Sequence, residues 1–204
     1  MSILIVRHGE TDSNARRIIQ TPDIPLSAKG NDQAKSLAQR LSALGITRII
    51  SSDYLRARQT AEHVAAAVNL QVEYTPLLRE RNFGDLRGTS YDDLVQDPFD
   101  IESDYIPPNG ESWLVFNQRV EQAWKQISEQ ASPPQGKLLV VTHGLVCRSL
   151  YQRQFVIPDE VKDFSSYGNT ALSEVETIEP WTMKLLNCTA HLQHQKASSI
   201  SSIA

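Results

Sequence analysis

The sequence predicts an α/β fold with an open, mostly parallel sheet, because short apolar segments alternate along the chain with segments of helical periodicity. Residues 3–6, 48–51 and 137–142 have the length and composition of buried strands. Between and after them, apolar residues recur every three to four positions, as expected for helices that pack on a sheet. We therefore expect a sheet whose strands are connected by helices.

Three apolar stripes predict three helices. The first helix should have Ser27 as its N-cap and end near Gly45, and the second should begin just before Arg56. The stripes consist of Ala34, Leu37, Ala38, Leu41 and Leu44; of Leu55, Ala61, Val64, Ala65 and Val68; and of Trp113, Phe116, Val120, Ala123, Trp124 and Ile127. Later, residues 170–178 and 181–187 flank Glu179 and Pro180, which predicts two strands joined by a tight turn.

The composition is that of one ordinary globular domain. Of 204 residues, 40% are hydrophobic and 22% charged, so we expect a single domain over residues 1–195 and a disordered, Ser-rich tail over 196–204. A net charge of −4 gives no basic surface for nucleic acid or membranes, and no apolar run reaches the roughly 18 residues of a membrane span. Two cysteines, distant in sequence, make a cytoplasmic location the simplest expectation.

Two predicted strands end in the same way. Arg7-His8-Gly9 follows the first strand, and Thr142-His143-Gly144 follows the strand at 137–142. In a parallel sheet, reactive groups collect where strands end and helices begin. Either histidine alone is more often structural, but two at equivalent strand ends indicate one shared site.

Other charged residues lie where neither a helix stripe nor a turn requires them. Arg56 lies in the first turn of a predicted helix, the end at which the helix dipole disfavours cations. Glu80 lies between Arg79 and Arg81, where a surface ion-pair cluster is the alternative explanation. Two histidines and a carboxylate could bind iron or zinc, but Arg7 and Arg56 would repel a metal cation. An anion such as phosphate fits better, since guanidinium groups match phosphate oxygens and a neutral imidazole can attack phosphorus.

Five ordered segments together resemble the histidine phosphatase superfamily, the phosphoglycerate mutase-like family. They are "RHGET" followed by Asn14, "SSDYLRARQTA", "RERNFGDLRG", "NGES" and "THG", within residues 3–148, and "GNTALSEV" at 168–175 is also similar. The resemblance implies a three-layer sandwich with helices on both faces of a mostly parallel sheet. It also implies a phosphohistidine intermediate, and no metal or other cofactor.

The resemblance assigns a role to each matching position. His8 would be the nucleophile, and Arg7, Arg56 and His143 would hold the phosphoryl oxygens. Glu80 would protonate the leaving oxygen and then activate water. His8 must then be neutral with its other nitrogen donating to an acceptor, whereas Glu80 needs a raised pKa and His143 is most useful as a proton donor. Asn14, Gly144 and Arg81 are assigned to phosphate or substrate binding, Arg81 with a structural ion pair as alternative.

The reaction remains open between hydrolysis and mutase-type phosphoryl transfer. Mutases are expected to carry extra basic residues after the Glu80 motif, but residues 89–109 contain no Lys or Arg. They contain six acids: Asp92, Asp93, Asp97, Asp100, Glu102 and Asp104. If this segment covers the pocket, it favours a phosphatase acting on a small organic monophosphate with a neutral, cationic or apolar alcohol. The alternative is a solvated loop remote from the site.

Other expectations concern the leaving group and the partners. Phe83, Tyr91, Phe99 and Tyr105 form either an apolar wall for the leaving group or part of the core. A silent phosphate-binding or scaffold protein is the least favoured function, because every core position holds a competent residue. The expected partner is a small phosphate ester, not nucleic acid or a membrane, and the late strand pair offers an edge for a homodimer.

Overall fold

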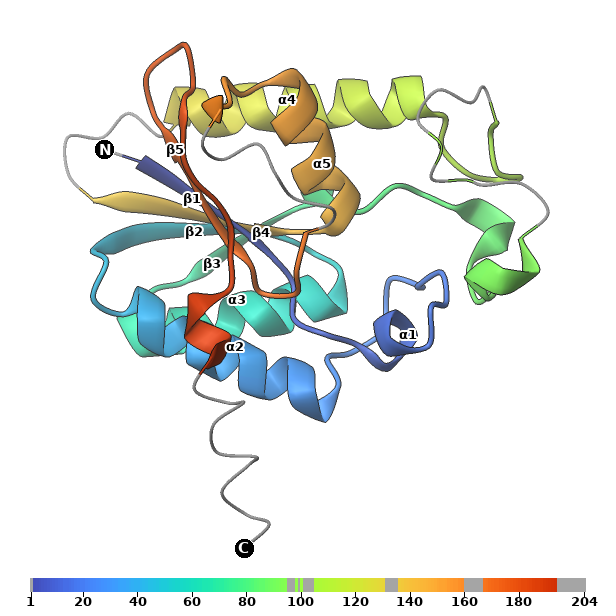
Figure 1. Ribbon diagram of the computed structural model, residues 1–204, viewed down its shortest axis with the longest axis horizontal. Helices are drawn as coiled ribbons and strands as arrows, with labels where there is room; N and C mark the ends of the chain where they lie inside the picture. The colour runs from blue at the N-terminus through green and yellow to red at the C-terminus, as the bar shows by residue number, and fades with distance from the viewer. Residues whose placement is uncertain are drawn as a thin grey trace, which may run out of the picture.

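A computed structural model describes residues 2–94, 98, 100, 105–130, 136–159 and 167–193. Its six-stranded sheet has the order β3-β2-β4-β1-β5-β6 (Figure 1). The strands are β1 (Ser2–Arg7), β2 (Ile46–Ser52), β3 (Val72–Thr75), β4 (Lys137–Thr142), β5 (Leu172–Glu176) and β6 (Met183–Cys188). The first four are parallel, and β5 and β6 pair antiparallel. The predicted mostly parallel α/β sheet is therefore confirmed.

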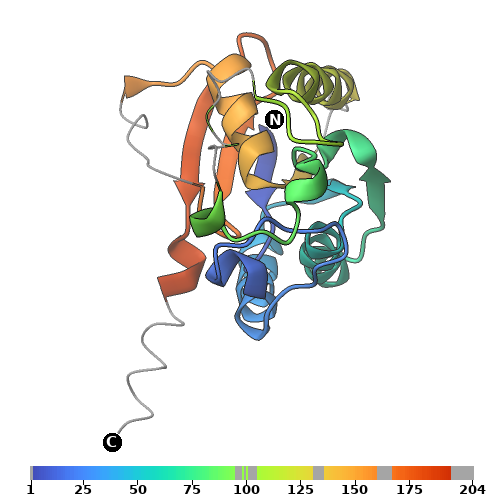
Figure 2. The ribbon, with the colours of Figure 1, turned by 90° about the vertical axis from the view of Figure 1, so that its right-hand side faces the viewer.

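Helices cover both faces of this sheet. They are α1 (Asp12–Ala15), α2 (Ala28–Leu41), α3 (Leu55–Val68), α4 (Trp113–Gln130) and α5 (Gly144–Arg153). Helices α2 and α3 lie on one face and α4 and α5 on the other, as the two perpendicular views show (Figures 1 and 2). Short 3-10 turns occupy Pro76–Leu78, Gly84–Leu86, Tyr91–Asp93 and Ala190–Leu192. The expected three-layer sandwich is present.

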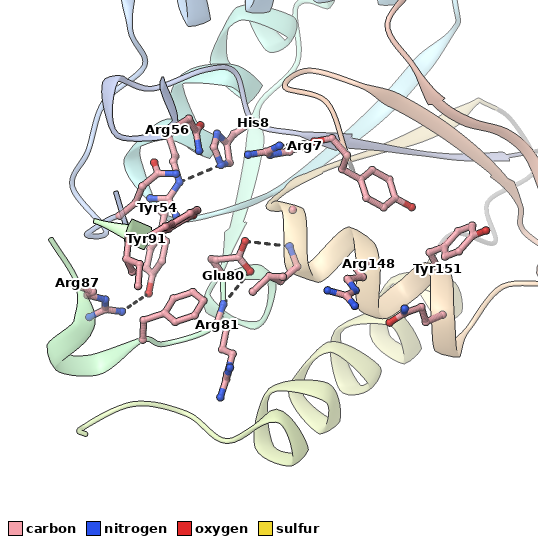
Figure 3. A pocket seen from close by; sticks show the side chains of 18 residues that line it. Arg7, His8, Tyr54, Arg56, Glu80, Arg81, Arg87, Tyr91, Arg148 and Tyr151 are labelled. Atoms are coloured by element: carbon pink, nitrogen blue, oxygen red, sulfur yellow. Dashed lines mark hydrogen bonds between the residues drawn. The ribbon is translucent and has the colours of Figure 1, made fainter. Parts of the chain in front are cut away.

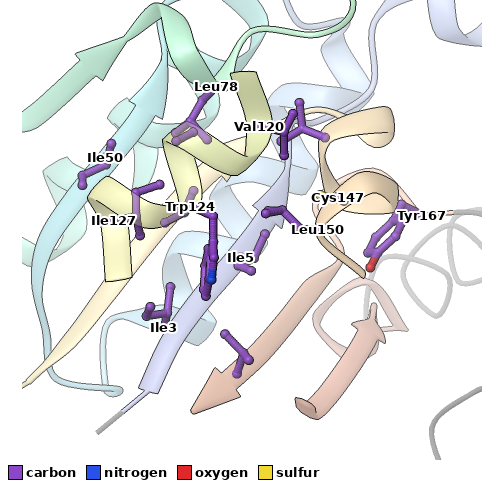
Figure 4. Close-up of a cluster of buried hydrophobic side chains, with 14 of the residues drawn as sticks. Ile3, Ile5, Ile50, Leu78, Val120, Trp124, Ile127, Cys147, Leu150 and Tyr167 are labelled. Carbon is purple, nitrogen blue, oxygen red and sulfur yellow. The ribbon is translucent and has the colours of Figure 1, made fainter. Parts of the chain in front are cut away.

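The central strand explains why the chain opens with a continuous apolar run. In β1, Ile3 and Ile5 contact the cluster under α4 and α5 (Figure 4), whereas Leu4 and Val6 contact the cluster under α2 and α3. Both sides of β1 are therefore buried, and side chains that alternate between two cores must all be apolar. The largest buried side chain, Trp124 of α4, lies on the first side.

Several element boundaries differ from the sequence predictions. Helix α2 has the expected cap, with Ser27 Oγ accepting from Gly30 N at 3.0 Å, but it ends at Leu41. Gly45 instead takes the positive φ of +68° in the turn before β2. Strand β3 was not predicted, because this four-residue edge strand is largely exposed and has no apolar run. The late antiparallel pair is confirmed, whereas the predicted tail at 196–204 lies outside the described residues.

No helix in the described part of the chain combines the length and apolarity needed to cross a bilayer.

Candidate active site

The two His-Gly pairs lie side by side because β1 and β4 are neighbouring parallel strands. Arg7 is opposite Thr142 in the register, and His8 N donates to the Thr142 carbonyl at 2.9 Å. The rings of His8 and His143 consequently face each other edge-on, with centroids 5.1 Å apart. The structure therefore brings the two His-Gly pairs together, as the strand ends predicted.

His8 has a fixed tautomer. Its Nδ1 lies 2.7 Å from the Gly9 carbonyl, which can only accept, so Nδ1 carries the proton. Its Nε2 accepts from Arg56 Nε at 3.2 Å. Burial lowers the pKa of His8 well below 6.5, and the charges of Arg56 and Arg7 lower it further. The lone pair of a neutral imidazole therefore faces two guanidinium groups.

Arg56 lies in the first turn of α3, as predicted, and its side chain is buried. Besides its bond to His8, its Nη1 donates to the Thr21 carbonyl at 3.0 Å, and its guanidinium carbon lies 5.2 Å from the centre of the Tyr54 ring. Burial lowers its pKa to about 10, which leaves it charged at neutral pH. A buried cation at the positive end of a helix is costly and implies an anionic partner.

Arg7 and its neighbours form the other side of the site. Its Nη1 donates to the Tyr167 carbonyl, whereas its buried Nε has no partner among the described residues. Gly144, at the start of α5, lies against this guanidinium: a Cβ there would be 3.5 Å from Arg7 Nε. Asn14 is held by Asn169: its Oδ1 accepts a hydrogen bond from Asn169 Nδ2 at 3.3 Å.

His143 is fully buried at the N-cap of α5. Its Nε2 lies 2.8 Å from Ser52 Oγ, whereas its Nδ1 has no partner in the described part of the chain. Burial and the nearby positive groups lower the pKa of His143 well below 6.5, so the free site holds it neutral. It can still donate from Nδ1 if the Ser52 hydroxyl donates to Nε2. A bound dianion would favour the charged form.

Glu80 is held by two backbone donors. Its Oε1 accepts from Arg81 N at 3.0 Å, and its Oε2 accepts from Leu145 N at 3.1 Å (Figure 3). Burial raises the pKa of Glu80, while these two hydrogen bonds and the charges of Arg56 and Arg7 oppose the rise. The direction is the one that a general acid near neutral pH requires.

The arginines that flank Glu80 in sequence have hydrogen-bond partners of their own. Arg79 pairs with Asp53 through contacts of 2.6 and 2.7 Å. The buried guanidinium of Arg81 points away from His8 (Figure 3) and donates to backbone carbonyls of Glu111, Pro98 and Tyr105. It also lies 4.2 Å from the centre of the Trp113 ring. The hydrogen-bond partners of Arg81 among the described residues are therefore carbonyls and not an acid, whereas its contact with substrate stays a prediction.

Most of the predicted site residues line a cavity of about 550 Å³: Arg7, His8, Asn14, Arg56, Glu80, Arg81 and Gly144. His143 packs against the His8 ring but is not among the lining residues. The charged lining of the cavity consists of Arg7, Arg56, Arg81, Arg87, Arg148 and Glu80. The described acids Asp92, Asp93 and Asp100 do not line it, and Asp92 is an exposed residue 3.8 Å from Arg17. For these three residues the structure favours the alternative of a position outside the cavity wall, and Asp97, Glu102 and Asp104 lie outside the described residues.

The aromatic wall is also different from the prediction. Phe83 and Tyr91 line the cavity, Tyr105 does not, and Phe99 lies outside the described residues. Three aromatic lining residues were missed: Tyr54, Tyr151 and Tyr167. Sequence reasoning also missed three polar residues, Thr60, Asn169 and Arg148. Of these, Asn169 could have been found, since it lies within the "GNTALSEV" motif and its Nδ2 donates to the His8 carbonyl at 3.1 Å.

Metal binding was the alternative chemistry. Over the described ranges, no three or more His, Cys, Asp or Glu side chains are grouped so that they could hold an ion.

Comparison with known proteins identifies the family. Residues 3–189 match the model of the histidine phosphatase superfamily, branch 1. A probable phosphoglycerate mutase, GpmB, of Escherichia fergusonii is 34% identical, over 94% of this chain and 95% of its own. The α-ribazole phosphatase of Shigella flexneri is 29% identical with a TM-score of 0.79, covering 93% of this chain and 98% of its own. Bacillus stearothermophilus YhfR is 28% identical with a TM-score of 0.80, covering 94% and 99%. The chain belongs to the histidine phosphatase superfamily.

Proposed function

We propose that this chain is a phosphomonoester hydrolase that works through a phosphohistidine on His8. The observation that carries the proposal is the state of His8: Nδ1 donates to the Gly9 carbonyl, and a neutral Nε2 faces a cavity that is also lined by Arg7, Arg56 and the half-buried Glu80. A nucleophile, two phosphate-binding cations and a candidate acid thus share one cavity.

The first half-reaction forms the phosphoenzyme. Arg7 and Arg56 bind the phosphoryl oxygens, and this contact draws Arg56 Nε–H away from the His8 lone pair. His8 Nε2 then attacks phosphorus as the bond from phosphorus to the ester oxygen breaks. Glu80 gives its proton to that oxygen, and the alcohol leaves.

The second half-reaction frees His8. The Glu80 carboxylate takes a proton from water, the resulting oxygen attacks phosphorus, and the bond to Nε2 breaks to release inorganic phosphate. His143 Nδ1, buried and without a partner among the described residues, is suited to donate to a phosphoryl oxygen in both transition states.

The test is hydrolysis of an aryl phosphate in excess EDTA by wild type, His8→Ala and His63→Ala. His63 lies on α3 and is not among the residues that line the cavity, so it controls for loss of an imidazole. The proposal requires that wild type and His63→Ala release phosphate and that His8→Ala does not. Equal release by His8→Ala would refute it.

Mutase activity is the second candidate, favoured by the GpmB relatives and by the cavity arginines. Incubation with 3-phosphoglycerate separates the two reactions. A hydrolase releases inorganic phosphate, whereas a mutase produces 2-phosphoglycerate with little release.

A further inference from the structure

The "NGES" motif at residues 109–112 contains a glutamate that the proposed mechanism does not use. Glu111 precedes α4 and forms a bidentate ion pair with Arg119 of that helix. Arg119 Nε donates to Glu111 Oε1 at 2.9 Å, and Arg119 Nη2 donates to Oε2 at 2.8 Å. The side chains of Glu111 and Arg119 are only 10% and 20% exposed, although neither residue lines the cavity. The pair therefore has a fixed geometry outside the site.

Arg119 also holds the backbone of the segment that carries Glu80. Its Nη1 donates to the carbonyls of Leu77 and Arg79, both at 2.9 Å, and its Nη2 donates to the Glu80 carbonyl at 3.4 Å. Residues 79–83 form neither a helix nor a strand, so regular secondary structure supplies no partners for their carbonyls. One guanidinium on α4 supplies partners instead.

Glu111 holds the same segment on the other side of Glu80. Its Oε2 accepts from Asn82 N at 3.1 Å, and its own backbone N donates to the Asn82 carbonyl at 2.8 Å. The Glu111 carbonyl accepts from Arg81 Nε at 2.9 Å. The ion pair thus fixes the chain both before and after Glu80.

The position of the Glu80 carboxylate depends on this backbone. Its Oε2 accepts from Leu145 N, in the first turn of α5, where a backbone N–H has no acceptor within its own helix (Figure 3). A shift of the segment would draw the carboxylate away from Leu145 and from the leaving oxygen. A general acid acts only within hydrogen-bond reach of its substrate atom, and a misplacement of about 1 Å can cost about 100-fold in rate.

We propose that Glu111 and Arg119 are positioning residues for Glu80. By fixing the backbone around Glu80, the pair keeps its carboxyl group where it protonates the leaving oxygen and later takes a proton from water. The proposal rests on the proposed hydrolase function. Because Arg119 binds a carboxylate and backbone carbonyls at the same time, its planar guanidinium is required and not its charge alone. Arg119→Lys, which keeps the charge, should therefore behave like Arg119→Gln.

The test compares benzyl phosphate, whose leaving oxygen needs a proton, with 4-nitrophenyl phosphate, whose leaving oxygen does not. We measure kcat/KM, which reports formation of the phosphoenzyme, and take the ratio of the two esters, which does not depend on the folded fraction of a variant. Arg119→Gln and Arg119→Lys should lower kcat/KM about 10- to 100-fold on benzyl phosphate and less than about threefold on 4-nitrophenyl phosphate. Arg48 also pairs bidentately with a glutamate, Glu73, but does not line the cavity, so Arg48→Gln should keep the wild-type ratio. A wild-type ratio in Arg119→Gln or in Arg119→Lys would overturn the proposal.

Amide hydrogen exchange separates failure of the positioning role from failure of the hydrolase. The Leu145 N–H is measured by NMR relative to the amides of α2, which corrects for a change in global stability. It should exchange faster in Arg119→Gln than in wild type, as in Glu80→Ala, and at the wild-type rate in Arg48→Gln. If exchange changes in this way but wild type shows no His8-dependent hydrolysis, the positioning role stands and the hydrolase function is wrong. If hydrolysis depends on His8 but Arg119→Gln leaves the exchange of Leu145 unchanged, the positioning role is overturned and the hydrolase function stands.

Discussion

The buried histidines make the stability of this protein depend on pH. His8 and His143 both have pKa values held well below 6.5, so at pH 5.5 each imidazole binds a proton in the unfolded chain but not in the folded one. The unfolded state then carries more protons, and the free energy of unfolding decreases as the pH falls through 6.5. Between pH 7 and 5.5, each histidine contributes a loss of about 1.3 kcal/mol, or about 2.5 kcal/mol for the pair.

Urea unfolding of wild type and His8→Asn at pH 7 and 5.5 measures the contribution of one imidazole. The buffer must contain no phosphate, because an anion that binds the folded site would stabilise it. We expect the difference in unfolding free energy between the proteins to change by about 1.3 kcal/mol between the two pH values, in favour of the variant at low pH.

Taking this difference removes the contribution of Glu80, which both proteins carry and which has the opposite sign. The raised pKa of Glu80 means that the folded state holds its proton more tightly, so this contribution is lost as the pH rises. If the difference in unfolding free energy between wild type and variant is the same at pH 7 and pH 5.5, His8 titrates normally in the folded state. The argument for a permanently neutral nucleophile would then fail.

Three further predictions concern single side chains. Glu80→Gln should lower kcat by about 100- to 10,000-fold on alkyl phosphates and far less on aryl phosphates with good leaving groups; equal losses on both would contradict its role as acid. Thr60→Val should cost about 1–3 kcal/mol in urea unfolding, because the buried Gly9 N–H loses its acceptor at 3.0 Å; an unchanged midpoint would show that this bond is unimportant. Gly30→Ala should lower the free energy of unfolding by about as much in the same assay, because its Cβ would lie 1.9 Å from the Glu10 carbonyl oxygen. Wild-type stability of this variant would show that α2 can shift freely.

The core of the site could be predicted because it follows from a regular feature of the fold. Neighbouring parallel strands end at the same edge of the sheet, so two apolar strands that each end in His-Gly bring His8 and His143 together. Arg56 could also be predicted as a site residue from the sequence. A cation in the first turn of a helix is locally unfavourable, so its presence there indicates an interaction outside the helix.

The positions of the arginines beyond this core could not be predicted. Arg81 follows Glu80 in sequence, yet its guanidinium donates to carbonyls of Pro98, Tyr105 and Glu111, which lie in a part of the sequence without helical or strand periodicity. Arg148 lies on a regular helix, but no sequence pattern reveals that it lacks an acid partner in the described structure. Contacts between residues distant in sequence decide the position of Arg81.

Burial shifts the pKa values of His8 and Glu80 in opposite directions. The same desolvation lowers the pKa of the His8 imidazole and raises that of the Glu80 carboxyl, so in the proposed mechanism burial favours both a neutral nucleophile and a protonated acid. The charges of Arg7 and Arg56 add to the lowering of the His8 pKa and oppose the raising of the Glu80 pKa. In the proposed mechanism, a bound phosphoryl dianion offsets their charge, so Glu80 holds its proton more tightly once the phosphoryl group is in place. Binding of the phosphoryl group therefore prepares the acid.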